Sequence, residues 1–424
     1  MTFSDLLQSM VSKEFDESVL LRFFEDVFNM ENIALIDVKC KDGIKKGDSY
    51  LSEVHNFTVV VSGKHKGNGT VVDISLPVIT KGLPKSVGWR KTFRSVDFFR
   101  NETIFYNTVW KAMNQFQLEK NVKVFNGIPL CLSAYADGIN DYIALENVNH
   151  KGFMQLNRCD GLDFQHTQLI MKLFARFHAL GLAFKDQNPV EFDKIASALH
   201  ETYFCEKYRN WYSNFQTNNL FPVLCDAIKQ QLPESYLKRF KEVTKDDFFG
   251  KLITSCEKRG PLAVITHGDA WAPNFLWKYE NDNLIDAIVI DFQLARYASL
   301  GLDITFFLYA CTEQSLRLKY WDVLIEDYHK TFTSTLKELG SNPELLTLHD
   351  LKEEIKSSGL FGVGMSMEAL AMSLLGDDDV ADLEGIEGEE VSLESVWILP
   401  LFKDVKKQQR LANMIKHAVD NNFI

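Results

Sequence analysis

The sequence lacks the features that mark several large classes of protein. Its seven cysteines are odd in number and form no Cys-x-x-Cys pair, so we expect neither a disulfide framework nor a zinc ribbon. Acidic residues outnumber basic ones by 58 to 46, the net charge is −12, and no basic run is long enough to bind a nucleic-acid backbone. No segment has the ~18 uncharged apolar residues that cross a bilayer, and the N-terminus has no signal-peptide core. We therefore expect a cytoplasmic protein with no nucleic-acid or membrane partner and no obligate protein partner.

The remaining composition is that of a large, packed, soluble protein. The chain has 424 residues, of which 46% are hydrophobic and 25% charged. This length is enough for two or three domains or lobes, and for an enzyme.

The hydrophobic periodicity changes along the chain. Residues 3–30 have helical spacing, whereas residues 55–61 and 70–80 are rich in Val, Ile and Thr and predict a β-hairpin. Further helices are expected at residues 96–113, 167–183, 201–214, 232–243, 303–312, 316–339 and 401–419, with short strands within 130–148 and a β-rich segment at 263–292. We predict an α+β chain with a small N-terminal lobe containing an antiparallel sheet (1–143), a hinge (144–150) and a mostly helical C-terminal lobe (151–424).

The β-rich segment contains the most informative motif, ITHGDAWAPNFLWKY, followed by LIDAIVIDFQLAR. Asp269 and Asn274 lie in a loop after one apolar run, and Asp291 follows a second run, where a strand would end. Phosphoryl transfer from a nucleotide needs a carboxylate near the acceptor hydroxyl, a second carboxylate on Mg²⁺ and a neutral oxygen ligand. Taken singly, each residue could be a turn or strand-end residue, but together they predict a phosphotransfer site.

The pattern HGDxxxxN with a strand-end Asp resembles the small-molecule kinases of protein-kinase-like fold, such as choline and aminoglycoside kinases. Within them the sequence is most similar to the ecdysteroid kinase-like family. The segments that carry the resemblance, which covers roughly residues 30–424, are GDSYLSEV (47–54), FRNETIFY (99–106), GLDFQHTQLIMKLFARFHALGLAF (161–184), HGDAWAPNFLW and DFQLARYASLGLDITFFL (291–308). The resemblance implies a two-lobed kinase fold that uses ATP and Mg²⁺.

The resemblance also implies individual roles. Asp269 would be the catalytic base, Asn274 and Asp291 would bind Mg²⁺, and His267 and Asp303 would support the catalytic loop. Local chemistry offers Asp303 another role, which we favour, because it precedes the apolar ITFFLYAC and would cap that helix.

A kinase must also hold the nucleotide phosphates, usually with a strand lysine paired to a helix glutamate. Lys81 ends the second hairpin strand, and Glu102 lies on an apolar helix stripe, where an acid needs a partner. The resemblance places these two residues in those roles. Lys85 or Lys91 could replace Lys81, and Glu102 could instead extend to solvent.

Two further nucleotide contacts are expected. The phosphate loop has only Gly47 in place of GxGxxG, so Ser49 and backbone N–H groups would contact phosphate. The segment ALENV would form the hinge, where the backbone of Glu146 and Val148 would bind adenine. This chain has Glu-Asn where related families usually have Glu-Asp.

We predict an ATP-dependent kinase that phosphorylates a hydroxyl of a lipophilic alcohol such as an ecdysteroid. The alternatives are a choline- or aminoglycoside-type kinase and a nucleotide-binding pseudokinase scaffold. An aromatic-rich stretch at residues 203–221 suits a flat apolar body, although much of it would be helix core. His178 is interpreted as a core histidine, and the acidic block at residues 376–390 as a solvated loop.

Overall fold

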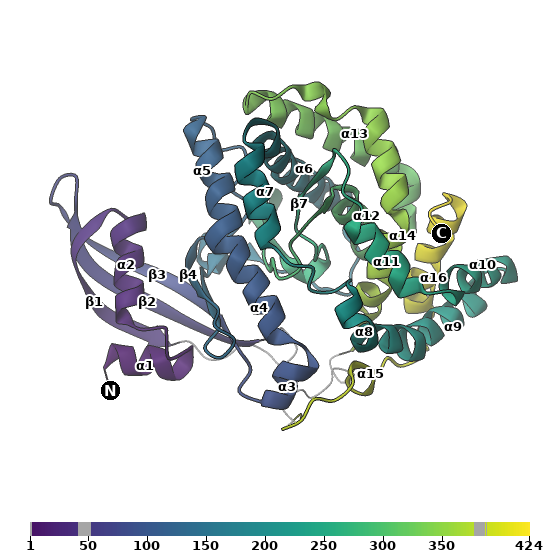
Figure 1. The fold of residues 1–424 in the computed structure, drawn as a ribbon, viewed down its shortest axis with the longest axis horizontal. Coiled ribbons are helices and arrows are strands. Elements are labelled where there is room, and N and C mark those ends of the chain that lie inside the picture. The colour runs from purple at the N-terminus through teal and green to yellow at the C-terminus, as the bar shows by residue number, and fades with distance from the viewer. Residues whose placement is uncertain (1, 41–51, 377–385, 387) are drawn as a thin grey trace. The chain divides into compact units, whose positions relative to one another are not determined.

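The computed structural model describes residues 2–40, 52–376, 386 and 388–424. By its internal contacts the chain divides into two units (Figure 1). The first comprises Met1–Asn107, Ile128–Phe153 and Asp382–Val391, and the second Thr108–Gly127, Met154–Ala381 and Ser392–Ile424. Ser49 lies outside the described residues, as does most of the acidic block, so the expectations for both stay predictions.

The first unit contains a five-stranded antiparallel sheet of order β1–β2–β3–β5–β4. Its strands are β1 (Met30–Cys40), β2 (Glu53–His65), β3 (Val71–Gly82), β4 (Cys131–Tyr135) and β5 (Tyr142–Glu146). The predicted hairpin is the β2–β3 pair, in which Val54 lies opposite Lys81. Buried residues alternate along β2, as expected for a sheet with one face against a core.

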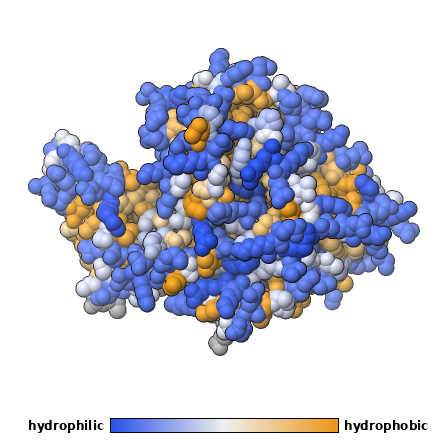
Figure 2. All heavy atoms as spheres, viewed as in Figure 1, coloured by the Kyte–Doolittle hydropathy of each residue, from blue (hydrophilic) through white to orange (hydrophobic). Residues whose placement is uncertain are grey.

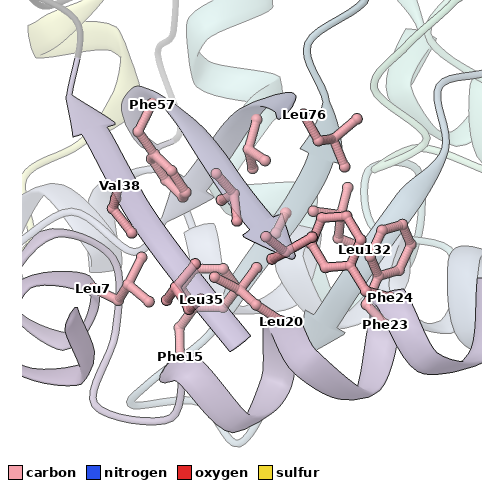
Figure 3. Close-up of a cluster of buried hydrophobic side chains, with 14 of the residues drawn as sticks. Leu7, Phe15, Leu20, Phe23, Phe24, Leu35, Val38, Phe57, Leu76 and Leu132 are labelled. Atoms are coloured by element: carbon pink, nitrogen blue, oxygen red, sulfur yellow. The ribbon is translucent and has the colours of Figure 1, made fainter. Parts of the chain in front are cut away.

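Two helices, α1 (Phe3–Met10) and α2 (Glu17–Val27), cover one face of this sheet (Figure 3). Each begins at a side-chain cap: Thr2 and Asp5 form a reciprocal capping box, and Asp16 accepts a hydrogen bond from the Val19 N–H. The core between helices and sheet is apolar throughout. Its labelled members in Figure 3 are Leu7, Phe15, Leu20, Phe23, Phe24, Leu35, Val38, Phe57, Leu76 and Leu132.

The first unit also holds α3 (Val87–Thr92) and α4 (Ser95–Ile104), which continues through a π-helical turn (Phe105–Trp110) into α5 (Lys111–Glu119). A short strand, β6 (Phe153–Met154), lies at the sequence boundary between the units.

Beyond α5 the second unit is mostly helical. The helices are α6 (Phe164–Gln187), α7 (Pro189–Ala198), α8 (Arg209–Phe215), α9 (Phe221–Gln231), α10 (Glu234–Lys245), α11 (Phe248–Glu257), α12 (Gly301–Cys311), α13 (Gln314–Glu338), α14 (Leu348–Ser373), α15 (Leu393–Val396) and α16 (Val405–Asp420). The central α12 is buried along its whole length and packs against α14, while α13 packs against α6.

Two antiparallel strand pairs lie within the second unit. β7 (Ala263–Thr266) pairs with β10 (Arg296–Ser299), and β8 (Phe275–Glu280) pairs with β9 (Asn283–Val289). Strands β7, β8 and β9 lie in the β-rich segment predicted at residues 263–292, whereas β10 follows that segment.

Several local expectations differ from the structure. The helix expected at residues 201–214 begins only with a 3-10 turn at Glu206, followed by α8. Helical spacing was expected through residue 30, but α2 ends at Val27 and Met30 begins a strand, with Asn29 in a left-handed conformation between them. The periodicity did not indicate α7, α9, α11 or α14. From Phe361 onward α14 is buried on nearly all sides and has no single apolar stripe. The other three helices each bury one stripe, which was not recognised in the sequence.

No helix among the described residues is long and apolar enough to cross a membrane. Figure 2 shows hydrophilic residues over most of the visible face, with hydrophobic residues in small patches between them.

Candidate functional site

The loop after β7 is fixed by a glycine that cannot be replaced. Gly268 has a positive φ of 83°, and a Cβ at this position would lie 1.9 Å from the Leu294 carbonyl oxygen. The left-handed turn therefore needs glycine, both for its conformation and for the close approach of another backbone segment. It presents Asp269, which is 9% exposed, directly after the strand.

The carboxylate of Asp303 anchors the backbone of this loop. Its carboxylate accepts hydrogen bonds from the His267 N–H at 2.6 Å and the Gly268 N–H at 2.8 Å. Burial alone would raise the pKa of Asp303, but hydrogen bonding to His178 and the nearby His267 and Gly268 groups keep it below its usual range. The capping role that we favoured is wrong: α12 begins after Leu300, and the carboxylate bonds the HGD loop instead of the helix's own N–H groups.

A buried hydrogen-bond network extends from Asp303 to His178 and Tyr328. His178 on α6 lies with its Nε2 3.0 Å from Asp303 and its Nδ1 2.8 Å from the Tyr328 hydroxyl on α13. The interpretation of His178 as a satisfied core histidine is confirmed, since the residue is fully buried and bonded at both nitrogens. The link to Asp303 could not be read from the sequence, because the two residues are 125 positions apart.

His267 connects the loop to β9. Its Nε2 lies 2.9 Å from the Ile290 carbonyl oxygen, and its Nδ1 accepts a hydrogen bond from the Asp269 N–H at 3.1 Å. The donor must therefore be Nε2, which assigns the neutral tautomer with its proton there. Burial lowers the pKa of His267, which agrees with this uncharged form.

Asn274 joins the other two residues of the predicted motif. Its Nδ2 donates to the Asp269 backbone oxygen and to Asp269 Oδ2, both at 2.9 Å. Its backbone oxygen accepts the Ile290 N–H at 3.0 Å, which positions the residue beside Asp291. Asp291 lies two residues beyond the end of β9 with a φ of 71°, a conformation uncommon for a residue with a Cβ and frequent at functional sites.

The electrostatics of the motif centre on Asp269. Burial raises the pKa of Asp269 to about 7, and the charge of Asp291 contributes in the same direction. The hydrogen bond from Asn274 acts oppositely, as does one at 3.4 Å from Gln293 Nε2. A carboxylate with this pKa can take up and release a proton near neutral pH.

The oxygen ligands available for a metal are few. Within the described part of the chain, no group of three or more His, Cys, Asp or Glu residues could hold a metal ion. Asp291 offers a carboxylate and Asn274 offers its side-chain Oδ1. The Nδ2 group of Asn274 is the one that bonds Asp269. Such a sparse set fits Mg²⁺, which proteins often bind with one or two side chains and the phosphates of a substrate.

The first unit contains a separate ion pair. Lys81 Nζ on β3 donates to both carboxylate oxygens of Glu102 on α4, at 3.2 and 3.1 Å. Glu102 is 3% exposed, so its charge is paired where burial would otherwise be costly. The alternative lysines have other partners: Lys85 lies 3.8 Å from Glu53, and Lys91 lies 3.9 Å from Glu389.

The predicted hinge lies at the end of β5. The Glu146 N–H donates to the Leu130 oxygen at 2.8 Å, and the Glu146 carboxylate pairs with Lys151 at 2.7 Å. Val148 is buried and begins a 3-10 turn, in which the Asn147 side chain accepts a hydrogen bond from the Asn149 N–H. The Glu-Asn of this chain thus caps a turn with a neutral group where an Asp would be charged.

The sequence did not reveal two polar residues near Asp269. Gln293 follows Asp291 by two positions, and a polar residue so close to a candidate metal ligand could have been predicted to lie in the site. Glu368 on α14 affects the pKa of Asp269 through its charge, yet no motif marks it.

The sequence is similar to one family of known proteins. The sequence profile of the ecdysteroid kinase-like family matches residues 46–341. No curated protein sequence matches significantly. The match, with the antiparallel sheet of one unit and the helices of the other, confirms the predicted α+β, protein-kinase-like fold.

Several solved structures are similar at low identity. A GDP complex of a variant of aminoglycoside 2′-phosphotransferase-IIIa has 15% identity and a TM-score of 0.38, covering 95% of this chain and 97% of that one. Plasmodium vivax ethanolamine kinase has 13% identity and a TM-score of 0.40, covering 99% and 94%.

Proposed function

Because the chain belongs to the ecdysteroid kinase-like family, we propose that it transfers the γ-phosphoryl group of ATP to a hydroxyl of a lipophilic small molecule. The observation that carries the proposal is the HGD loop, in which Asp269 is held by Asn274 and by a backbone anchored on Asp303. Phosphoryl transfer depends mainly on positioning and electrostatics, and this loop supports both.

Asp269 acts as the general base. Its pKa of about 7 lets the carboxylate accept the proton of the acceptor hydroxyl at neutral pH. The hydrogen bond from Asn274 to Oδ2 fixes the rotation of the carboxylate, which leaves Oδ1 for the hydroxyl.

Asp291 and Asn274 hold Mg²⁺ together with the nucleotide phosphates. When bound, the metal neutralises charge on the transferring phosphoryl group. The protein supplies the positions of both ligands, since the hydrogen bond between the Asn274 backbone oxygen and Ile290 ties the loop to the strand end.

Lys81 contacts the ATP phosphates and is oriented by Glu102. Glu146 and Val148 hold adenine through their backbones, because the Glu146 carboxylate is already paired with Lys151. Ser49, which lies outside the described residues, remains a proposed phosphate contact.

His267 and Asp303 support the catalytic loop without touching substrate. Asp303 bonds two successive backbone N–H groups, and neutral His267 bridges Asp269 to Ile290. These bonds restrain the loop in the conformation that presents Asp269.

A lipophilic alcohol such as an ecdysteroid is the proposed acceptor class, and family membership supports it most directly. The net charge of −12 favours a second candidate, a cationic amino alcohol of the choline or aminoglycoside type. A pseudokinase scaffold is disfavoured by the retained Asp269, Asn274 and Asp291.

The test is a product screen by mass spectrometry. Purified protein, ATP and Mg²⁺ are incubated with ecdysone, other hydroxylated lipids, choline, ethanolamine and an aminoglycoside, with Asp269→Asn as the matched inactive control. We expect a mass gain of one phosphoryl group on a lipophilic alcohol with the wild type alone. Phosphorylation of choline or an aminoglycoside in preference would refute the acceptor class, and no product from any alcohol would refute the kinase assignment.

A further inference from the structure

One acid in the second unit lies where an acid is unexpected. From Phe361 to Leu375 every residue of α14 and its C-terminal turn is buried except Glu368, which is partly exposed. The rest of this stretch is packed helix core, and Glu368 is the one acid within it.

Two tyrosine hydroxyl groups hold the carboxyl group of Glu368. The Tyr203 hydroxyl donates to it, 3.0 Å from Oε1 and 2.9 Å from Oε2, and the Tyr212 hydroxyl donates to Oε2. A carboxylate offers about four acceptor positions, so two donors leave capacity for a further one. Burial raises the pKa of Glu368 to about 7, against the effect of the tyrosine hydrogen bonds.

The aromatic rings around Glu368 do not form an open cage for a cation. Tyr203 and Tyr212 pack edge to face with centroids 4.7 Å apart, Tyr203 packs against Trp211 at 5.2 Å, and Tyr212 is fully buried. Their faces are used in packing, and their hydroxyl groups are directed at the carboxyl group. This arrangement orients a hydrogen-bond acceptor and does not provide cation–π recognition.

A chain of contacts connects Glu368 to Asp269. Thr202, next to Tyr203, donates through Oγ1 to the Gln293 carbonyl oxygen at 3.2 Å, and Gln293 Nε2 lies 3.4 Å from Asp269 Oδ2. The charge of Glu368 is also close enough to contribute to raising the pKa of Asp269. The two carboxyl groups therefore belong to one neighbourhood of the second unit.

We propose that Glu368 is the second anchor of the acceptor and accepts a hydrogen bond from a hydroxyl other than the one that is phosphorylated. This inference rests on the proposed function and narrows it, because the acceptor must then carry at least two hydroxyl groups. A hydroxyl group can donate to either protonation state of the carboxyl group, whereas an ammonium group gains its charge attraction only from the ionised state. The anchor fixes which hydroxyl reaches Asp269.

A site built to bond a hydroxyl discriminates against an analogue that lacks it. Loss of one hydrogen bond to a charged or half-charged group corresponds to about a 10- to 100-fold fall in kcat/KM. Glu368→Ala removes the acceptor, whereas Glu368→Gln retains a carbonyl oxygen and is expected to keep most of the discrimination. Glu353→Ala, which removes an exposed acid of the same helix, is the matched control.

The experiment compares these variants on ecdysone and on ecdysone derivatives that each lack one hydroxyl group. One derivative should have a kcat/KM about 10- to 100-fold below that of ecdysone in the wild type, Glu353→Ala and Glu368→Gln. In Glu368→Ala the two compounds should have similar kcat/KM values, mainly because KM for ecdysone rises. Thermal melting and ADP calorimetry on every variant separate this effect from loss of folding or of the nucleotide site.

Each alternative outcome has a distinct meaning. Unchanged discrimination in Glu368→Ala, or an equal loss on all compounds, would refute the anchor while the kinase assignment stands. Preferred phosphorylation of choline, abolished in both Glu368→Ala and Glu368→Gln, would replace the hydroxyl by a cation. A wild type that binds ADP but phosphorylates no alcohol would refute the proposed function, and the anchor with it.

Discussion

Replacing Asp303 by Asn tests the support of the catalytic loop. Oδ1 accepts the Gly268 N–H, and Oδ2 accepts the His267 N–H and contacts His178 Nε2. An amide has one oxygen, so in either orientation its NH₂ group faces a buried backbone N–H. One charge-assisted hydrogen bond is lost, and the amide NH₂ and the backbone N–H face each other without an acceptor. Each of these two effects costs about 1.5–3 kcal/mol, so the free energy of unfolding should fall by about 3–5 kcal/mol.

Denaturant unfolding monitored by tryptophan fluorescence measures this change. Asp322→Asn is the control, because Asp322 forms an exposed ion pair with Lys352 at 3.2 Å that is worth less than about 1 kcal/mol. The lowered pKa of Asp303 means that its contribution is present above about pH 4 and is lost as the pH falls through the lower folded-state value. The stability of the two proteins should therefore converge in acid. A difference below about 1 kcal/mol at pH 7 would refute the buried role of the carboxylate.

The remaining predictions concern activity. Asp269→Asn should lower kcat by about 10²- to 10⁴-fold with ADP affinity retained in calorimetry, and comparable turnover would remove Asp269 from the mechanism. Since the base acts deprotonated and its pKa is about 7, kcat/KM should decline as the pH falls below about 7; a flat profile down to pH 5 would contradict this. Asp291→Asn should reduce both the Mg²⁺-dependent ATP affinity and the rate. If ATP affinity of the wild type did not depend on Mg²⁺, this role of Asp291 would be refuted. Lys81→Met should weaken ATP and ADP but not adenosine, and equal losses for all three would make the lysine structural.

The sequence predicted residues that lie close together along the chain or that follow strong periodicity. The hairpin containing Lys81, the helix containing Glu102 and the HGD loop were all found, because alternation, a lone acid on an apolar stripe and a long motif are local signals. The contacts of Asp303 were misassigned because its position before an apolar run resembles a helix cap. Only the folded structure shows that β7 brings the HGD backbone to that carboxylate.

Glu368 shows why the remaining part of the site was beyond sequence reasoning. It lies in a helix without a clear apolar stripe, and its partners Tyr203 and Tyr212 come from a segment more than 150 positions earlier. The aromatic stretch that suggested a flat ligand instead packs within itself and against helix residues such as Phe249 and Phe361, and it uses two hydroxyl groups to orient one acid. With Glu368 as the proposed anchor, recognition of the substrate would depend on the distance between the Glu368 carboxyl group and Asp269, and composition carries no information about that distance. Under the proposed anchoring by Glu368, one substitution on α14 would change acceptor choice while the HGD loop stays the same.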